Sequence, residues 1–194
     1  MAFHEHPGPF PRKVVLFSGH MIDKPDRPTP RFPASKEKVA ASEIGRTLDQ
    51  IGAAGASDLA ICGGACGGDL LFAEAAIARN LRLELYLPLP ENEFLAQSVD
   101  FANADWHQRY LKAKAAAQLH ITPNELGPSN EDPFERNNLR MLDVATSFGA
   151  EKLDFVCLWN GEGGDGPGGT QHLMQAVKSK GGNTYWLDTT KLWT

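Results

Sequence analysis

Short apolar runs alternate along this chain with segments of helical periodicity. The runs of strand length cover residues 13–17, 58–62, 81–87, 118–122, 154–159 and 184–187. Strands separated by helices predict parallel pairing, because each return to the sheet requires a crossover connection. The pattern therefore predicts an α/β fold: a three-layer, Rossmann-like arrangement in which a mostly parallel sheet has helices on both faces.

Helices are expected between these runs from spacing and capping signals. The expected segments are 35–51 with Ser35 as its N-cap, 70–80, one long helix over 91–117, a helix that starts after Asp132, and 170–180. Asp132 gives the clearest start, since Pro133 suits the first helical position and Glu135 completes a capping box. We expect a single domain over 1–194, with a loose lead-in over 1–12.

Composition and charge narrow the classes of partner. The 194 residues are 42% hydrophobic and 22% charged, as in globular proteins. A formal net charge of −5 argues against an extended nucleic-acid surface, which would be basic. No apolar run is long enough to cross a bilayer, so no membrane partner is expected.

Cysteine and histidine usage predicts the compartment and the cofactor content. The three cysteines, Cys62, Cys66 and Cys157, contain no CxxC pair, which predicts a reducing, cytoplasmic location. The histidines show no metal-ligand spacing, so neither a metal nor another cofactor is expected. The sequence leaves open a homo-oligomer.

Glycines are concentrated in two loops that each lead from a predicted strand into a predicted helix. The first loop covers 63–69 and the second covers 160–170. Glycine lets a backbone approach a ligand closely, and the helix that follows offers its positive end to an anion. Parallel sheets bind ligands at the carboxyl ends of their strands. The two loops therefore predict a nucleotide or nucleotide-derived ligand; tight turns with glycine helix caps are the structural alternative.

Three segments carry a family resemblance. Residues 63–68 read GGACGG and continue into a helix with AEAA at 73–76, residues 135–141 read ERNNLRM, and residues 167–170 read PGGT. In this order they resemble the SLOG superfamily of Rossmann-like domains, which includes the Lonely-guy phosphoribohydrolases, DprA and the N-terminal domain of TRPM channels. The resemblance implies that Arg136 acts at the site and that the PGGT loop holds phosphate. Neither a G-x-G-x-x-G dinucleotide fingerprint nor a P-loop is present.

The resemblance and the loops together define the expected site. The expected ligand-binding residues are Ser18, Gly19, His20, Gly63, Gly64, Gly67, Gly68, Asp69, Arg136, Trp159, Gly164, Asp165, Gly168, Gly169 and Thr170. For His20, a loop residue that forms hydrogen bonds within the protein is an equally good interpretation. Trp159 could flank the base of the ligand. Arg27 and Arg31 could reach a phosphate, although solvent exposure is the favoured interpretation for both.

Three functions stay open, of which binding or sensing of a nucleotide-derived ligand is preferred. The hydrolases of the family end their phosphate motif with glutamate, and the corresponding position here is Gln175, which cannot accept a proton. The first alternative is therefore an enzyme, a nucleoside 5′-monophosphate phosphoribohydrolase or other N-glycosidase, whose candidate catalytic residues are Arg136, Asp69, Glu74 and Asp165. The second alternative is a structural interaction domain with vestigial loops.

Overall fold

The computed structural model describes residues 9–102, 104–122, 132–163 and 168–193. In these residues six strands form one sheet with the order β4-β3-β2-β1-β5-β6, and every neighbouring pair is parallel. The strands are β1 (Lys13–Gly19), β2 (Asp58–Cys62), β3 (Arg82–Leu87), β4 (Ala117–Ile121), β5 (Leu153–Trp159) and β6 (Asn183–Asp188). This confirms the predicted Rossmann-like α/β class.

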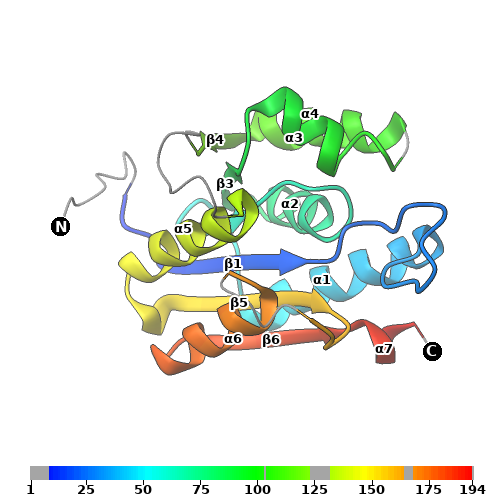
Figure 1. Ribbon diagram of the computed structural model, residues 1–194. Coiled ribbons are helices and arrows are strands. Elements are labelled where there is room, and N and C mark those ends of the chain that lie inside the picture. Colours follow the sequence, from blue (N-terminus) through cyan, green and yellow to red (C-terminus); the bar gives the residue numbers. More distant parts are fainter. Residues whose placement is uncertain (1–8, 103, 123–131, 164–167, 194) are drawn as a thin grey trace.

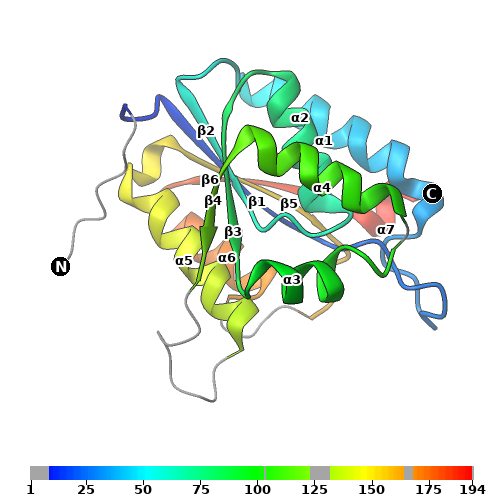
Figure 2. The same cartoon turned by 90° about the horizontal axis from the view of Figure 1, so that it is seen from above.

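Helices cover both faces of the sheet (Figure 1 and Figure 2). One face packs against α1, α2 and α4, and the other packs against α5 and α6. The helices are α1 (Glu37–Ile51), α2 (Gly68–Ala78), α3 (Glu91–Ser98), α4 (Ala104–Ala116), α5 (Pro133–Ser147), α6 (Thr170–Ser179) and α7 (Thr189–Leu192).

Strand alternation divides the core into two layers. In β1, Val15 and Phe17 point to the α1 and α2 side, whereas Val14 and Leu16 point to the α5 and α6 side, and all four are fully buried. Successive side chains of a strand face opposite ways, so a sheet covered on both faces needs continuous apolar strands. This explains why the apolar runs of β1 and β5 do not alternate with polar residues.

The predicted helix over 91–117 is wrong in one respect, because the structure contains two helices there. The first ends at Ser98, whose carbonyl oxygen accepts a 2.8 Å hydrogen bond from the Cys66 N–H of the first glycine loop. Val99 follows with its side chain completely buried. Tertiary contacts with the β2–α2 loop therefore end α3, which helical periodicity alone does not reveal.

Two capping predictions had different outcomes. Asp132 caps α5 as predicted, since its carboxylate accepts a 2.8 Å bond from the Phe134 N–H. Ser35 does not cap α1; it lies within a 3-10 turn over Ala34–Lys36, and α1 begins at Glu37. The turn is closed by the Lys36 N–H bonding to the Pro33 carbonyl, which delays the start of the α-helix.

The sheet order places a topological switch point between β1 and β5. From β1 the chain builds outward through β2, β3 and β4, then crosses back to β5 and builds outward on the other side to β6. Connections leave these two neighbouring strands in opposite directions, which opens a crevice at their carboxyl ends. Ligands of such sheets bind there, so a site is expected at this edge.

Candidate ligand-binding site

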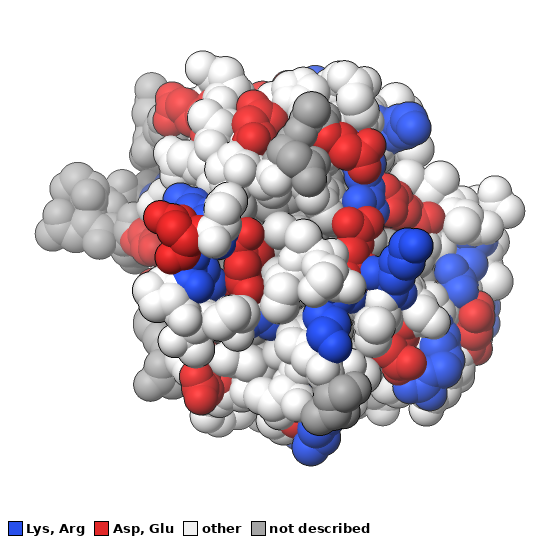
Figure 3. Space-filling view, turned by 90° about the vertical axis from the view of Figure 1, so that its right-hand side faces the viewer, with Lys and Arg blue, Asp and Glu red and all other residues white. Residues whose placement is uncertain are grey.

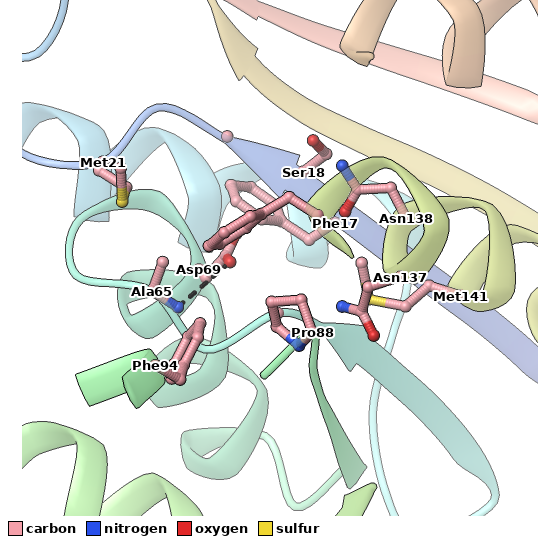
Figure 4. Close-up of a pocket in the computed structure, with 13 residues that line it drawn as sticks. Phe17, Ser18, Met21, Ala65, Asp69, Pro88, Phe94, Asn137, Asn138 and Met141 are labelled. Atoms are coloured by element: carbon pink, nitrogen blue, oxygen red, sulfur yellow. Dashed lines mark hydrogen bonds between the residues drawn. The ribbon is translucent and has the colours of Figure 1, made fainter. Parts of the chain in front are cut away.

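A pocket of about 190 Å³ opens at the carboxyl ends of β1, β2 and β3 (Figure 4). The end of β1 supplies one wall, the first glycine loop a second, and the first three turns of α5 a third. The lining residues are Phe17, Ser18, Gly19, Met21, Gly63, Ala65, Asp69, Pro88, Phe94, Phe134, Asn137, Asn138 and Met141. Of the sequence-predicted residues, the structure therefore brings Ser18, Gly19, Gly63 and Asp69 to the pocket.

Among the described residues, the carboxylic acid of the pocket is Asp69, in the first turn of α2. Its side chain points into the pocket beneath the loop, and Oδ2 accepts a 3.3 Å hydrogen bond from the Ala65 N–H (Figure 4). Burial raises the pKa of Asp69 to about 7, although the N–H groups of Ala65, Gly63 and Gly64 favour the charged form. Asp69 thus titrates near neutral pH, in the range that suits a general acid or base.

Two neighbouring asparagines of α5 present amides to the pocket wall. Asn137 is 2% exposed; it donates a 2.7 Å bond to the Tyr86 carbonyl and accepts a 3.0 Å bond from the Thr122 hydroxyl. Asn138 donates a 3.0 Å bond to the carbonyl of Gly168 in the second glycine loop. Asn137 therefore ties α5 to the end of β3, and Asn138 ties α5 to the loop before α6.

The N-terminus of α6 lies beside the pocket. Thr170 is the first residue of this helix, and its hydroxyl oxygen is 3.4 Å from that of Ser18, which lines the pocket. The N–H groups of a first helical turn have no acceptor within the helix, and they carry the positive end of its dipole. Of the two helix starts, this one offers the better place for an anion.

The other helix start, that of α2, is largely occupied by protein contacts. The Gly68 N–H donates to the His20 carbonyl at 3.0 Å, and the Leu70 N–H donates to the Ala65 carbonyl at 3.2 Å. Gly67 has a φ of +93° and pairs with Met21, so that a Cβ there would lie 2.6 Å from the Ile22 nitrogen. Gly67 and Gly68 therefore allow the loops after β1 and β2 to pack closely against each other, which is one reason why the sequence has glycines at these two positions.

His20 joins the loops that follow β1 and β5. Its Nε2 accepts a 3.1 Å hydrogen bond from the Asn160 N–H, and its backbone N–H donates to the Leu158 carbonyl at 2.9 Å. Burial is the main cause that lowers the pKa of His20 to about 4, and the charge of Arg31 adds to it. His20 is thus a neutral loop tie and is not among the pocket-lining residues.

The low pKa of His20 predicts acid sensitivity. In the unfolded chain histidine has a pKa near 6.5, so the unfolded state binds the proton first. The stabilisation is complete above pH 6.5 and is lost as the pH falls towards 4, at about 1.4 kcal/mol per pH unit. Between pH 7 and pH 5, urea unfolding should show that the free energy of unfolding of the wild type falls relative to that of His20→Gln. His107→Gln, at a partly exposed histidine of α4, should retain the wild-type slope.

Other sequence-predicted residues lie away from this pocket. Arg136 is on α5 but not on the wall, and its buried Nε has no hydrogen-bond partner among the described residues. Glu74 forms a bidentate pair with Arg109 of α4, with distances of 2.6 and 2.7 Å. Trp159 is 5% exposed and donates to the Glu162 carbonyl. Gly164 and Asp165 lie outside the described residues.

The residues that sequence reasoning missed are mostly apolar. Phe134, Asn137, Asn138 and Met141 line the pocket from α5 at positions i, i+3, i+4 and i+7. This spacing defines one helix face, and two asparagines within an otherwise apolar stripe were a readable signal of polar contacts. Phe94 of α3 had no such signal, because its position depends on the break after Ser98.

The face at the carboxyl ends of β1 and β5 shows no strong charge bias, and the described residues hold no metal-ligand cluster. Acidic and basic side chains are interspersed on the face at the carboxyl ends of β1 and β5 (Figure 3). In the described part of the chain, no three His, Cys, Asp or Glu side chains gather as metal ligands would. None of the described helices is long and apolar enough to span a bilayer.

The chain thus combines a Rossmann-like parallel sheet with a pocket at the carboxyl ends of β1, β2 and β3. By structure it is similar to DNA processing protein A (DprA) from Streptococcus pneumoniae, with a TM-score of 0.46 and 13% identity over 91% of this chain and 50% of that one. It is also similar to the protein TM1055, with a TM-score of 0.40 and 13% identity over 92% of this chain and 94% of that one. This chain thus spans about half the length of DprA.

Sequence comparisons add no further assignment. No family model matches the chain, and no curated protein matches it. Because the sequence identity is 13% and both TM-scores are below 0.5, these similarities support no statement about the function of this chain.

Proposed function

We propose that this chain binds a nucleotide-derived ligand in the pocket at the carboxyl ends of β1, β2 and β3. The observation that carries the proposal is the position of the α6 N-terminus beside this pocket, where Thr170 contacts Ser18. A phosphate at this helix start would accept hydrogen bonds from backbone N–H groups and from both hydroxyls. The start of α6 would then bind the phosphate and the apolar pocket would bind the base, so one site would hold both parts of a nucleotide.

The apolar part of the pocket suits a base or a sugar. Phe134 and Met141 of α5, Phe94 of α3 and Pro88 line it together with the amides of Asn137 and Asn138. Met141 and Asn137 lie on one side of Pro88, and Phe94 lies on the other (Figure 4). Pockets for drug-sized ligands have volumes of about 300–1,000 Å³. At about 190 Å³, this pocket holds one ring system with its attached phosphate reaching towards α6.

Asp69 supports an N-glycosidase as the second candidate function. Cleavage of an N-glycosidic bond needs a carboxylate that activates water or stabilises the cationic sugar. Gln175, the position that corresponds to the family's glutamate, is exposed on α6, whereas Asp69 lies in the pocket with a pKa of about 7. If the chain is an enzyme, Asp69 is its best-placed acid or base.

Nucleoside monophosphates should stabilise the folded protein. At 100 times its Kd, a ligand adds about 2.7 kcal/mol, which corresponds to a rise in Tm of roughly 5–10 °C for a chain of this size. Ser18→Ala should weaken AMP binding by about 10-fold or more, because it removes a hydroxyl beside the phosphate. The matched control is Ser179→Ala at the opposite end of α6, where the hydroxyl bonds the Ala176 carbonyl. Calorimetric titration of the three proteins measures both effects.

Two results would contradict the binding proposal. No stabilisation by any of a panel of mononucleotides, dinucleotides and cyclic oligonucleotides would favour a structural interaction domain. Equal AMP affinity in Ser18→Ala and the wild type would remove the phosphate from the α6 start. Release of adenine and ribose 5-phosphate from AMP, abolished by Asp69→Asn, would instead establish the enzyme.

A further inference from the structure

A second cavity lies next to the first one, within the loop that connects β1 to α1. Its volume is about 260 Å³, and its lining residues are Met21, Ile22, Asp23, Lys24, Asp26, Arg27, Pro28, Arg31 and Phe101. Met21 lines both cavities, so they adjoin each other across its side chain. Neither cavity alone reaches the volume of a typical ligand site, but the two together do.

The loop around this cavity is ordered by Asp23. One carboxylate oxygen of Asp23 accepts 2.8 Å hydrogen bonds from the N–H groups of Arg31 and Phe32, and the other lies 3.3 Å from Arg27 Nε. The Asp23 N–H donates to the Phe32 carbonyl at 2.9 Å. Trp193 fixes the far side, because its indole N–H donates to the Arg31 carbonyl and its ring stacks on Phe32. The backbone that carries Arg31 is therefore held before any ligand binds.

Positive charge on the cavity wall exceeds negative charge. Lys24, Arg27 and Arg31 line it together with the two carboxylates of Asp23 and Asp26. The buried Nε of Arg31 has no hydrogen-bond partner among the described residues. Arg27 and Arg31 line the same cavity, and burial, followed by the charge of Arg27, lowers the pKa of the Arg31 guanidinium. A bound anion would supply both the missing acceptor and the missing charge.

We propose that this cavity is a subsite for a second phosphoryl group, bound by Arg31 and Arg27, on a ligand whose nucleoside occupies the adjoining pocket. The inference rests on the proposed function and extends it, because it makes the ligand a nucleotide with two separated phosphoryl groups. One group lies at the α6 start beside Ser18, and the other lies beyond Met21. Guanidinium forks suit this role, since they bind phosphate oxygens in pairs.

The test compares AMP, adenosine 3′,5′-bisphosphate and inorganic pyrophosphate by calorimetric titration. The wild type should bind the bisphosphate about 10- to 100-fold more tightly than AMP, as expected for one charge-assisted hydrogen-bonded contact. Arg31→Gln, which retains most of the side-chain stem, should abolish this gain and leave the AMP affinity within about 2-fold of the wild type. Arg46→Gln, at an arginine of α1 that pairs with Glu43, is the matched control and should change nothing.

The outcomes separate this inference from the proposed function. Equal affinity for AMP and the bisphosphate, unchanged in Arg31→Gln, would overturn the subsite while the nucleotide pocket stands. The subsite is likewise overturned if the bisphosphate is preferred but Arg31→Gln retains the preference. Pyrophosphate binding that is lost in Arg31→Gln, together with no binding of either nucleotide, would retain the anion cavity and refute the nucleotide pocket.

Discussion

Asp69→Asn should make the protein more stable at pH 8 and leave its stability almost unchanged at pH 3. Burial raises the pKa of Asp69 to about 7, from 3.8 in the unfolded chain, so the folded state binds the proton more tightly. The contribution of Asp69 to wild-type stability therefore falls as the pH rises from 3.8 to 7 and is constant above 7. The full loss is up to about 4 kcal/mol. Urea unfolding of both proteins across this range should show a difference that grows with pH.

A matched acid separates this effect from a general change in charge. Asp49→Asn removes a carboxylate on α1 that pairs with Arg79 and has a lowered pKa. Its effect on stability should therefore have the opposite sign at neutral pH, although it should be small because Asp49 is exposed. An Asp69→Asn variant that is no more stable than the wild type at pH 8 would show that Asp69 is not held in an unfavourable charged form. A carboxyl group that destabilises the folded protein when it is charged is typical of a functional site.

The fold was readable from the sequence because its signals are local. The apolar runs at β1, β2 and β5 are buried on both faces, and such runs separated by helices specify a parallel sheet. The Asp132 cap was readable for the same reason, since it depends on its own helix. The division of 91–117 was not readable, because α3 ends where the Ser98 carbonyl meets Cys66 of another loop.

Only part of the site could be predicted from the sequence. A glycine indicates a close approach or an unusual backbone conformation, but it does not indicate which group approaches. The GGACGG loop indicated close approach, but at Gly67 the closely approaching group is the backbone of Met21 and Ile22. Asp69 was named from its place after this loop, and its perturbed pKa depends on burial that only the fold reveals. The helical spacing of the α5 residues indicated one helix face with polar contacts, but not that this face lines a pocket. The sequence therefore predicted at which edge of the sheet the site lies, whereas the residues that line the pocket depend on the tertiary structure.

Gly168→Ala should cost far more stability than Gly163→Ala, although both glycines lie in the loop between β5 and α6. Both have a positive φ, +72° for Gly168 and +67° for Gly163, so an alanine in either place carries a similar backbone strain of about 1–2 kcal/mol. At Gly163 no atom lies within 4 Å of the added Cβ, whereas at Gly168 the Cβ would overlap the Glu135 backbone. The steric overlap should add about 1–3 kcal/mol.

The pair also tests how the second glycine loop contributes to the pocket. Gly168 accepts the Asn138 bond and donates its N–H to Nδ1 of His172, so displacing it moves the loop away from α5 and shifts the start of α6. AMP affinity should therefore fall by more than about 10-fold in Gly168→Ala and by less than about 3-fold in Gly163→Ala. Chemical denaturation gives the stability difference, and titration gives the affinities. Equal losses of stability would show that φ strain alone governs this loop, and unchanged affinity in a folded Gly168→Ala would place the phosphate away from α6.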